Sequence, residues 1–318
     1  MDEIKVDSSR GLIIDRTADD FEFGASKLSA TRKVLVLDGQ WDEFLPPPEL
    51  QRNDRGDVFG CVSYSHNNAI EILHRRFYGY EMNWDDRDLT VGSGTVPYKG
   101  NGIKKVAQWA RDNGLLKEMG GLTSGMSVGE FYDWKRTFDN ENEARDFLTT
   151  YELGYEWLPT CNWGQTYSSP EQMMEALLYS PIQASVDGNY QYNSDGTIGR
   201  LLNWSHEIVV YGYEKGKYWK VFDSESNEPL KFEWGYKFGY SMVHSIIKRN
   251  MKLYRKKNFP AIYALDAEDN LLVPFSDGKV AGGKMFKTIY GTSIYAQMPI
   301  EVVDELPYPI ADYSLSTI

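Results

Sequence analysis

Cys61, His206 and Asp223 are the residues of this 318-residue chain whose types and order suit one particular chemistry. A thiol nucleophile needs a base that takes its proton and a third group that orients the base. Cys61 lies in the run Gly-Cys-Val-Ser-Tyr-Ser (60–65), which opens an expected helix, and His206 begins a strand-like run far downstream. Cysteine, histidine and aspartate in this order predict an amide hydrolase that works through a thioester.

The position of Cys61 at a helix start favours a reactive thiolate. The partial positive charge and the N–H groups of a helix N-terminus lower a thiol pKa. Gly60 would let the backbone turn tightly into the helix, and the Cys61 N–H would supply half of an oxyanion hole. The alternative is a small buried residue at a helix start, which cysteine often is. Cys161, in Pro-Thr-Cys-Asn-Trp, has no comparable setting and is expected to be structural.

His206 is the best of the four histidines as the base. His66 and His74 lie on the Cys61 helix, too far along it to reach the thiol, and are expected on a helix face or the surface. His244 lies in an aromatic-rich segment and is expected to be a core residue. His206 alone begins a strand of the kind that could present an imidazole to a helix N-terminus.

Asp223 is expected to orient His206 through a β-hairpin. The strand from His206 to Tyr213 is followed by a Glu-Lys-Gly-Lys turn (214–217), and 218–223 forms the returning strand. With this turn at the centre, His206 lies opposite residues 223 to 225, and in the compatible registers it shares a face with Asp223. A slip of one residue would place the two on opposite faces. The alternative role for Asp223 is a solvated strand end.

Composition excludes several classes of function. A net charge of −12 argues against nucleic-acid binding. The acidic N-terminus is not a secretion signal, and no segment is apolar enough to span a membrane. Two cysteines are too few for a disulfide framework or a thiolate zinc site; one disulfide fits the count, but a reducing compartment is the simpler interpretation. We therefore expect a protein of the cytoplasm, unless the resemblance described below places it in a phage particle, and we expect no cofactor and no metal.

The order of elements predicts an α+β fold with a helical lobe first and an antiparallel β lobe second. Residues 1–45 form an N-terminal arm with one strand-like run (34–37), and three prolines (46–48) mark its end. The expected domain covers 46–256, and a small β-rich C-terminal module covers 257–318. Helices are expected at 61–78, 104–113, 141–149 and 170–178, and strands at 182–186, 207–213, 218–222, 242–247, 261–265 and 271–275.

These residues resemble the papain-like cysteine peptidases over roughly residues 46 to 250. The run 61–65 is similar to that family's Cys-Trp-Ala-Phe-Ser, and Glu71 lies where the family often has a helix glutamate. The run 180–186 resembles its Gly-Pro-Val strand. Residues 206–213 match its pattern of His, five residues, then Gly-Tyr. The pattern is most similar to divergent, disulfide-free members from tailed phages and bacteria, which implies a particle-borne or maturation peptidase.

The chain also departs from the family pattern. Val58 and Val62 replace a disulfide cysteine and a tryptophan, and Asp223 stands where the family commonly has asparagine. The oxyanion-hole glutamine would fall at Arg55, so Gln51 is expected to fill that role across a longer loop. The resemblance implies substrate-binding roles for Gly94 and Ser205. Ser93-Gly94 and 100–102 are candidates for a wall that pairs with substrate backbone, or are simple turns.

Two functions remain open at this point. In the first, the chain hydrolyses a peptide or protein substrate, and an isopeptidase or transpeptidase would use the same triad. In the second, a papain-like protein serves as a silent structural or binding component of a phage particle, with access to the triad blocked. An acidic arm (Asp15, Asp19, Asp20, Glu22) would lie across the cleft in that case, and the C-terminal module would bind a partner.

Overall fold

The computed structural model describes residues 12–17, 20, 22–23, 34–120, 122, 125–160, 166–199 and 204–248, with the backbone of five further strands between 252 and 303. Residues 1–144 and 153–246 form one compact unit, and 145–152 with 247–318 form a second. Every candidate site residue lies in the first unit. The second contains a three-stranded sheet and a two-stranded one: β11 (Lys252–Lys256), β12 (Ile262–Leu265), β13 (Lys284–Lys287), β14 (Ser293–Ala296) and β15 (Ile300–Val303).

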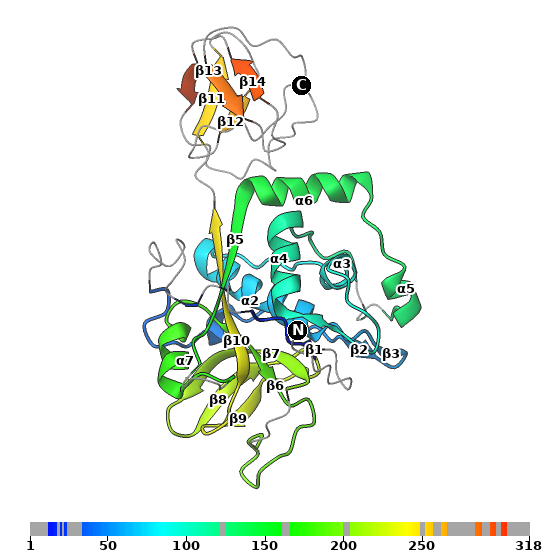
Figure 1. Cartoon of the computed structure of the whole chain (residues 1–318), viewed down its shortest axis with the longest axis vertical. Coiled ribbons are helices and arrows are strands. Elements are labelled where there is room, and N and C mark those ends of the chain that lie inside the picture. The colour runs from blue at the N-terminus through cyan, green and yellow to red at the C-terminus, as the bar shows by residue number, and fades with distance from the viewer. Residues whose placement is uncertain are drawn as a thin grey trace. The chain divides into compact units, whose positions relative to one another are not determined.

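Helices come first along the chain, and Figure 1 shows three of them, α2, α3 and α4, gathered on one side of the main unit. Two small strand pairs accompany them: β2 (Arg52–Asn53) with β3 (Gly56–Asp57), and β1 (Leu12–Ile13) with β4 (Asn101–Gly102). The helical elements are η1 (Asp42–Phe44), α2 (Cys61–Tyr78), α3 (Asp86–Gly92), α4 (Ile103–Asn113), α5 (Val128–Tyr132), α6 (Phe138–Thr150) and α7 (Pro170–Leu177).

A six-stranded sheet follows, in the order β5-β10-β6-β7-β8-β9. Its pairs β10–β6, β6–β7, β7–β8 and β8–β9 are all antiparallel, which confirms the α+β prediction of helices first and an antiparallel sheet second. The strands are β5 (Tyr151–Trp157), β6 (Ile182–Val186), β7 (His206–Glu214), β8 (Tyr218–Phe222), β9 (Leu230–Glu233) and β10 (Gly239–Lys248).

Most expected elements are present, and the exceptions have local causes. The run 34–37 is not a strand: the N–H groups of Leu35 and Val36 both donate to one carbonyl, that of Leu178, so no ladder forms. The short helices α3 and α5 were not expected, and neither were strands β5 and β9. The expected strand at 271–275 lies outside the described residues. Among the described residues, no helix is long and apolar enough to cross a membrane.

A buried polar contact fixes helix α2 against the sheet. Gln183 of β6 donates from Nε2 to the Ser65 hydroxyl (2.8 Å) and to the Val62 carbonyl (3.0 Å), while its Oε1 contacts His244 Nε2 at 2.8 Å. The Ser65 hydroxyl in turn donates to the Cys61 carbonyl at 2.7 Å. Because all these groups are buried, a shift of the helix would leave polar atoms unpaired. The N-terminus of α2 is therefore held in place relative to β6 and its neighbour β7.

A β-bulge sets the register of the β7–β8 hairpin. Gly212 pairs with Lys220, whereas Val210 pairs with Val221, so Tyr211 is an extra residue in β7. An unbroken ladder from the turn would place His206 on the face opposite to Asp223. The bulge is anchored from outside the hairpin, since the Trp41 N–H donates to the Tyr211 carbonyl at 2.9 Å.

Candidate active site

Cys61 is the first residue of α2, and its side chain is fully buried. The sequence predicts a tight turn at Gly60, but the left-handed residue is Phe59 (φ 55), and Gly60 has a φ of −92. A Cβ at 60 would lie 3.0 Å from Tyr64 Cε2 and 3.1 Å from Thr90 Oγ1, so a larger residue would crowd both side chains. Strained backbone such as that at Phe59 is often found at functional sites.

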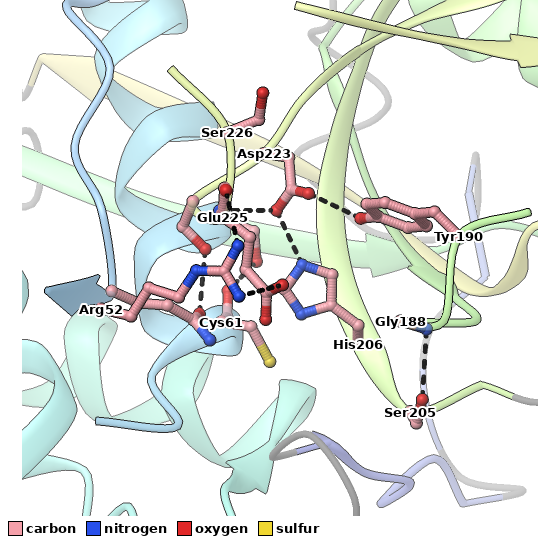
Figure 2. A network of polar contacts seen from close by, with 12 residues as sticks. Arg52, Cys61, Gly188, Tyr190, Ser205, His206, Asp223, Glu225 and Ser226 are labelled. Carbon is pink, nitrogen blue, oxygen red and sulfur yellow. Dashed lines mark hydrogen bonds and ion pairs between the residues drawn. The ribbon is translucent and has the colours of Figure 1, made fainter. Parts of the chain in front are cut away.

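His206 begins β7 and is also fully buried. Its Nε2 lies 2.7 Å from Asp223 Oδ1. Figure 2 shows the Cys61 sulfur on the side of the ring away from the nitrogen that Asp223 holds. The second ring nitrogen, Nδ1, has no partner with hydrogen-bond geometry among the described residues, but Cys61 contributes to the raised His206 pKa. The structure therefore places the imidazole between the carboxylate and the thiol.

The charges of the three groups depend on one another. Burial opposes protonation of His206, but the negative charge and hydrogen bond of Asp223 raise the His206 pKa well above 6.5. The His206 charge in turn lowers the pKa of Asp223, against the effect of burial. Asp223 and His206 thus form an ion pair at neutral pH.

The Cys61 pKa differs from the sequence expectation. Burial raises it above its ordinary value, and this effect exceeds the lowering by the His206 hydrogen bond and charge. The structure thus favours Cys61 as a neutral thiol. Water reaching Cys61 would relieve the desolvation and leave the lowering effect of His206.

Asp223 makes three hydrogen bonds with the described residues. Besides His206, the Tyr190 hydroxyl donates to Oδ2 at 2.6 Å and the Glu225 N–H donates to Oδ1 at 3.1 Å. Tyr190 is not apparent as a site residue from the sequence, because it lies in a loop that follows β6 with no recognisable motif. Since both carboxylate oxygens are held, the direction in which Asp223 faces His206 is fixed.

Arg52 forms an ion pair with Glu225, which lies two residues after Asp223. Arg52 Nη1 lies 3.5 Å from Glu225 Oε2, and Nη2 donates to the Glu225 carbonyl at 3.3 Å. The Glu225 side chain is 5% exposed, whereas that of Arg52 is 51% exposed. The ion pair therefore joins the loop after Asp223 to the strand β2.

Glu207, the residue after His206, is buried with its carboxyl against Ser185. Ser185 Oγ donates to Oε2 at 2.8 Å, and Oε1 has no hydrogen-bond partner among the described residues. Burial raises the Glu207 pKa well above 4.5. This shift favours the neutral carboxyl, and a negative charge there would raise the Cys61 pKa.

Gln51 lies between the loop that precedes Cys61 and the loop that follows Asp223. Its Nε2 donates to Asp57 Oδ1 at 3.2 Å, and its Oε1 accepts from the Ser224 hydroxyl at 2.9 Å. Its backbone N–H donates to the Ser224 carbonyl at 3.0 Å. The role of Gln51 in an oxyanion hole remains a prediction. The sequence did not indicate that a carboxylate, that of Asp57, would accept the hydrogen bond from the Gln51 amide.

The expected substrate-binding residues lie apart from the triad contacts. Ser205 is buried, and its hydroxyl accepts from the Gly188 N–H at 3.2 Å (Figure 2), so it supports the loop before β7. Gly94 lies in the turn after α3 with a φ of 78, and its carbonyl accepts from Lys105 Nζ at 3.3 Å. Substrate binding by either residue stays a prediction.

The other histidines and Cys161 complete the comparison with the sequence. His66 and His74 are buried, contrary to the expectation of a helix face or the surface. Their rings pack against aromatic partners, which for His66 is the ring of His244 at 4.7 Å. His244 is a core residue as expected. Cys161 and Asp19 lie outside the described residues.

Replacing Tyr190 with phenylalanine tests the support of Asp223. We expect the free energy of unfolding to fall by about 1–3 kcal/mol, because a buried carboxylate oxygen loses its donor. The Asp223 pKa should rise, since the Tyr190 hydrogen bond lowers it. Urea unfolding measures the change, and Tyr192→Phe is the matched control because Tyr192 is 63% exposed. Equal effects of the two substitutions would contradict this role.

Known proteins were compared with the chain as a whole. No protein-family model matches it, and no curated protein matches it. Solved structures of cysteine proteases do. The fold is similar to that of papain-like cysteine proteases.

Three of these structures illustrate the likeness. Procathepsin L 3 from the larval midgut of Tenebrio molitor is 14% identical, with a TM-score of 0.49 over 75% of this chain and 76% of that one. Bromelain from Ananas comosus, in complex with the inhibitor E64, is 16% identical, with a TM-score of 0.46 over 65% of this chain and 97% of that one. The ragweed pollen cysteine protease Amb a 11, in its proform, is 14% identical, with a TM-score of 0.48 over 71% of each chain. At identities of 14–16%, the activity of these proteins does not carry over to this chain, and its chemistry has to be argued from its own side chains.

Proposed function

We propose that the chain is a cysteine peptidase with Cys61 as nucleophile, His206 as base and Asp223 as the group that orients the base. The observation that carries the proposal is the arrangement of three buried groups, in which Asp223 holds one side of the His206 ring and the Cys61 sulfur lies on the other side (Figure 2). The contact with Asp223 accounts for a buried imidazole with a raised pKa, and it does not require a thiol nearby. Nucleophilic attack on an acyl group requires both a thiol and an adjacent acid–base group.

The arrangement defines each step. Once water reaches the site, Cys61 loses its proton to solvent, and the thiolate attacks a peptide carbonyl carbon while the carbonyl electron pair moves to oxygen. As the oxyanion collapses, the C–N bond breaks, imidazolium at His206 protonates the leaving amine, and a thioester remains on Cys61. Neutral His206 then takes a proton from water, which attacks the thioester; the C–S bond breaks, the acid leaves, and the Cys61 thiolate and the imidazolium are restored. The Cys61 N–H and the Gln51 amide are our candidates for stabilising the oxyanion.

Cleavage of a peptide library tests the proposal. The full-length chain is incubated with a proteome-derived peptide library, and new termini are mapped by mass spectrometry. Cys61→Ser is the matched control, because it keeps the size and polarity of the side chain. We expect cleavage that depends on Cys61 by a factor of roughly 10³ or more. Equal cleavage by the two proteins would exclude the proposal. An added amine nucleophile shows by product mass whether transpeptidation competes with hydrolysis.

Complete burial of Cys61 favours a second candidate, a papain-like protein that binds a partner and does not cleave it. In that case the thiol stays covered and its pKa stays raised. The absence of Cys61-dependent cleavage in the library experiment would support this function.

A further inference from the structure

Two aromatic side chains near the nucleophile project from strained backbone. Among the described residues, three that are not glycine have a positive φ, and all three are aromatic: Phe59 (φ 55), Tyr98 (φ 65) and Tyr240 (φ 33). A bulky residue adopts this conformation at a cost in free energy. The rings of Phe59 and Tyr98 contact each other, with 5.1 Å between their centroids. Two of the three strained positions therefore carry one aromatic pair.

Tyr98 occupies the glycine position of a tight turn. The Lys99 N–H donates to the Val96 carbonyl at 3.0 Å, and Pro97 precedes Tyr98. Proline at the second position and a positive φ at the third are typical of a type II turn, in which glycine is usual at the third position. Tyr98 is 73% exposed, so burial of its ring does not offset the strain. The turn would form more readily with glycine, and the tyrosine ring needs another reason.

Buried contacts fix the loop that carries Tyr98. Asn101 Nδ2 donates to Ser93 Oγ at 2.9 Å and to Thr95 Oγ1 at 3.1 Å, and all three residues are buried. The Gly100 N–H closes the turn by donating to the carbonyl of residue 96 at 2.8 Å. Because both ends of the turn are held, Tyr98 has a defined position beside its aromatic partner.

Phe59 is likewise held in its strained conformation. Its N–H donates to Asp57 Oδ1 at 2.6 Å. The carbonyl of the preceding Val58 accepts from the Tyr132 hydroxyl at 2.6 Å, and the Val58 side chain is fully buried. Strain of this kind persists only where the surrounding contacts determine the conformation. Phe59 itself is only half-buried, so part of its ring is open to contact.

The chain places the aromatic pair close to the bond that would be attacked. Phe59 precedes Cys61 by two residues, so their Cα atoms lie at most about 7.6 Å apart. In a thioester on Cys61, the carbonyl carbon is bonded directly to the Cα of the acyl residue. The side chain of that residue is therefore the part of a substrate best placed to reach Phe59 and Tyr98.

We propose that the aromatic pair of Phe59 and Tyr98 selects a peptide substrate with an aromatic side chain on the residue whose carbonyl Cys61 attacks. A third ring can pack on the pair in the edge-to-face or offset geometry that aromatic rings prefer, and it buries more apolar area than a small side chain would. A charged side chain would lose water there without gaining a partner. The inference rests on the proposed function, because it names the class of substrate for the same nucleophile.

Amino-acid chloromethyl ketones test the selection without any need for hydrolysis. The thiolate displaces chloride from such a reagent, which carries its side chain next to the ketone. The full-length chain is treated with the N-acetyl-phenylalanyl, N-acetyl-leucyl and N-acetyl-alanyl reagents, and labelling of Cys61 is followed by peptide mass spectrometry. Each rate is divided by the rate of the same reagent with glutathione. We expect the phenylalanyl reagent to react at least tenfold faster than the alanyl reagent and faster than the leucyl one. Equal rates, or no labelling of Cys61, would overturn the proposal.

Glycine substitutions identify the rings as the cause. Phe59→Gly and Tyr98→Gly should each lower the phenylalanyl-to-alanyl ratio at least threefold, because each removes one ring. Glycine suits a positive φ, so the backbone is kept, and in Tyr98→Gly the urea midpoint of unfolding should be unchanged or higher. Phe138→Ala is the matched control, since Phe138 is 78% exposed and begins α6, which supplies no site residue. A ratio that survives both glycine substitutions would show that the pair only packs within its own chain.

The peptide library separates this inference from the proposed function. Cleavage that depends on Cys61 but shows no enrichment of phenylalanine, tyrosine or tryptophan before the cut would leave the peptidase standing and overturn the selection. Faster labelling by the phenylalanyl reagent that is lost in both glycine variants, together with no library cleavage, would have the opposite meaning. The aromatic pair would then recognise its ligand, and the peptidase function would fail.

Discussion

Replacing His206 with glutamine is expected to slow alkylation of Cys61 by iodoacetamide at pH 7 by roughly 10²-fold, and peptide cleavage by roughly 10³-fold. His206 is the group that lowers the Cys61 pKa most, by its hydrogen bond and by its charge. Burial and the neighbouring Glu207 act in the opposite direction. Without His206, only the neighbouring backbone hydrogen bond still lowers the thiol pKa, so the thiolate becomes scarce.

The pH dependence separates this effect from a general loss of structure. Alkylation occurs when reagent and water reach Cys61, so it samples the hydrated site. In the unaltered chain, the rate should reach a plateau below the ordinary thiol pKa of about 8.5, because imidazolium at His206 favours the thiolate. In His206→Gln, the rate should rise only above that value. Cys161 serves as the reference thiol, and an unchanged pH profile for Cys61 would contradict the pairing.

Local sequence patterns were sufficient to predict the elements that carry the site. The helix Cys61–Tyr78 ends at Gly79 in the left-handed conformation (φ 75), as the sequence indicated. Strands Ile182–Val186 and Tyr218–Phe222 have the expected bounds. These segments were predictable because each buries one continuous pattern of apolar side chains, and that pattern is local.

The register of His206 and Asp223 shows what a local pattern misses. A hairpin centred on the Glu-Lys-Gly-Lys turn was expected to place His206 and Asp223 on the same face. The strand pairs next to the turn instead have the register that would place these two residues on opposite faces. A bulge at Tyr211 corrects it. The bulge is held by Trp41, some 170 residues earlier in the chain, so no inspection of the hairpin alone could find it. Tyr190 and Arg52 escaped detection for the same reason, since Tyr190 reaches the site from a loop and Arg52 from the short strand β2.

The site also contains conflicts that a sequence does not display. A helix N-terminus predicts a lowered Cys61 pKa, but complete burial outweighs it. Burial depends on which distant segments pack over the thiol, and the sequence does not place them. Gly102 is a further example, because its importance lies in the space that it leaves for Asp15.

Asp223→Asn and Asp223→Ala are expected to differ sharply, and the difference measures the negative charge at this position. Asparagine retains an oxygen that accepts from His206 Nε2 and from the Glu225 N–H, and its NH₂ can donate to the Tyr190 oxygen. The orientation of the ring is thus kept, and maximal cleavage should fall less than about tenfold. Alanine leaves His206 and Tyr190 without a partner in a buried site, and cleavage should fall by roughly 10³-fold.

The two variants should also differ in their pH profiles. Asp223 is the main cause of the raised His206 pKa, so the loss of its charge lowers the pH at which imidazolium gives up its proton. The alkaline limb of the cleavage profile reports this proton, because imidazolium must protonate the leaving amine. In Asp223→Asn, that limb should move to lower pH by about one unit or more, while the acid limb moves little. An alkaline limb that stays in place would show that Asp223 acts through geometry alone, and that asparagine would serve this chain equally well.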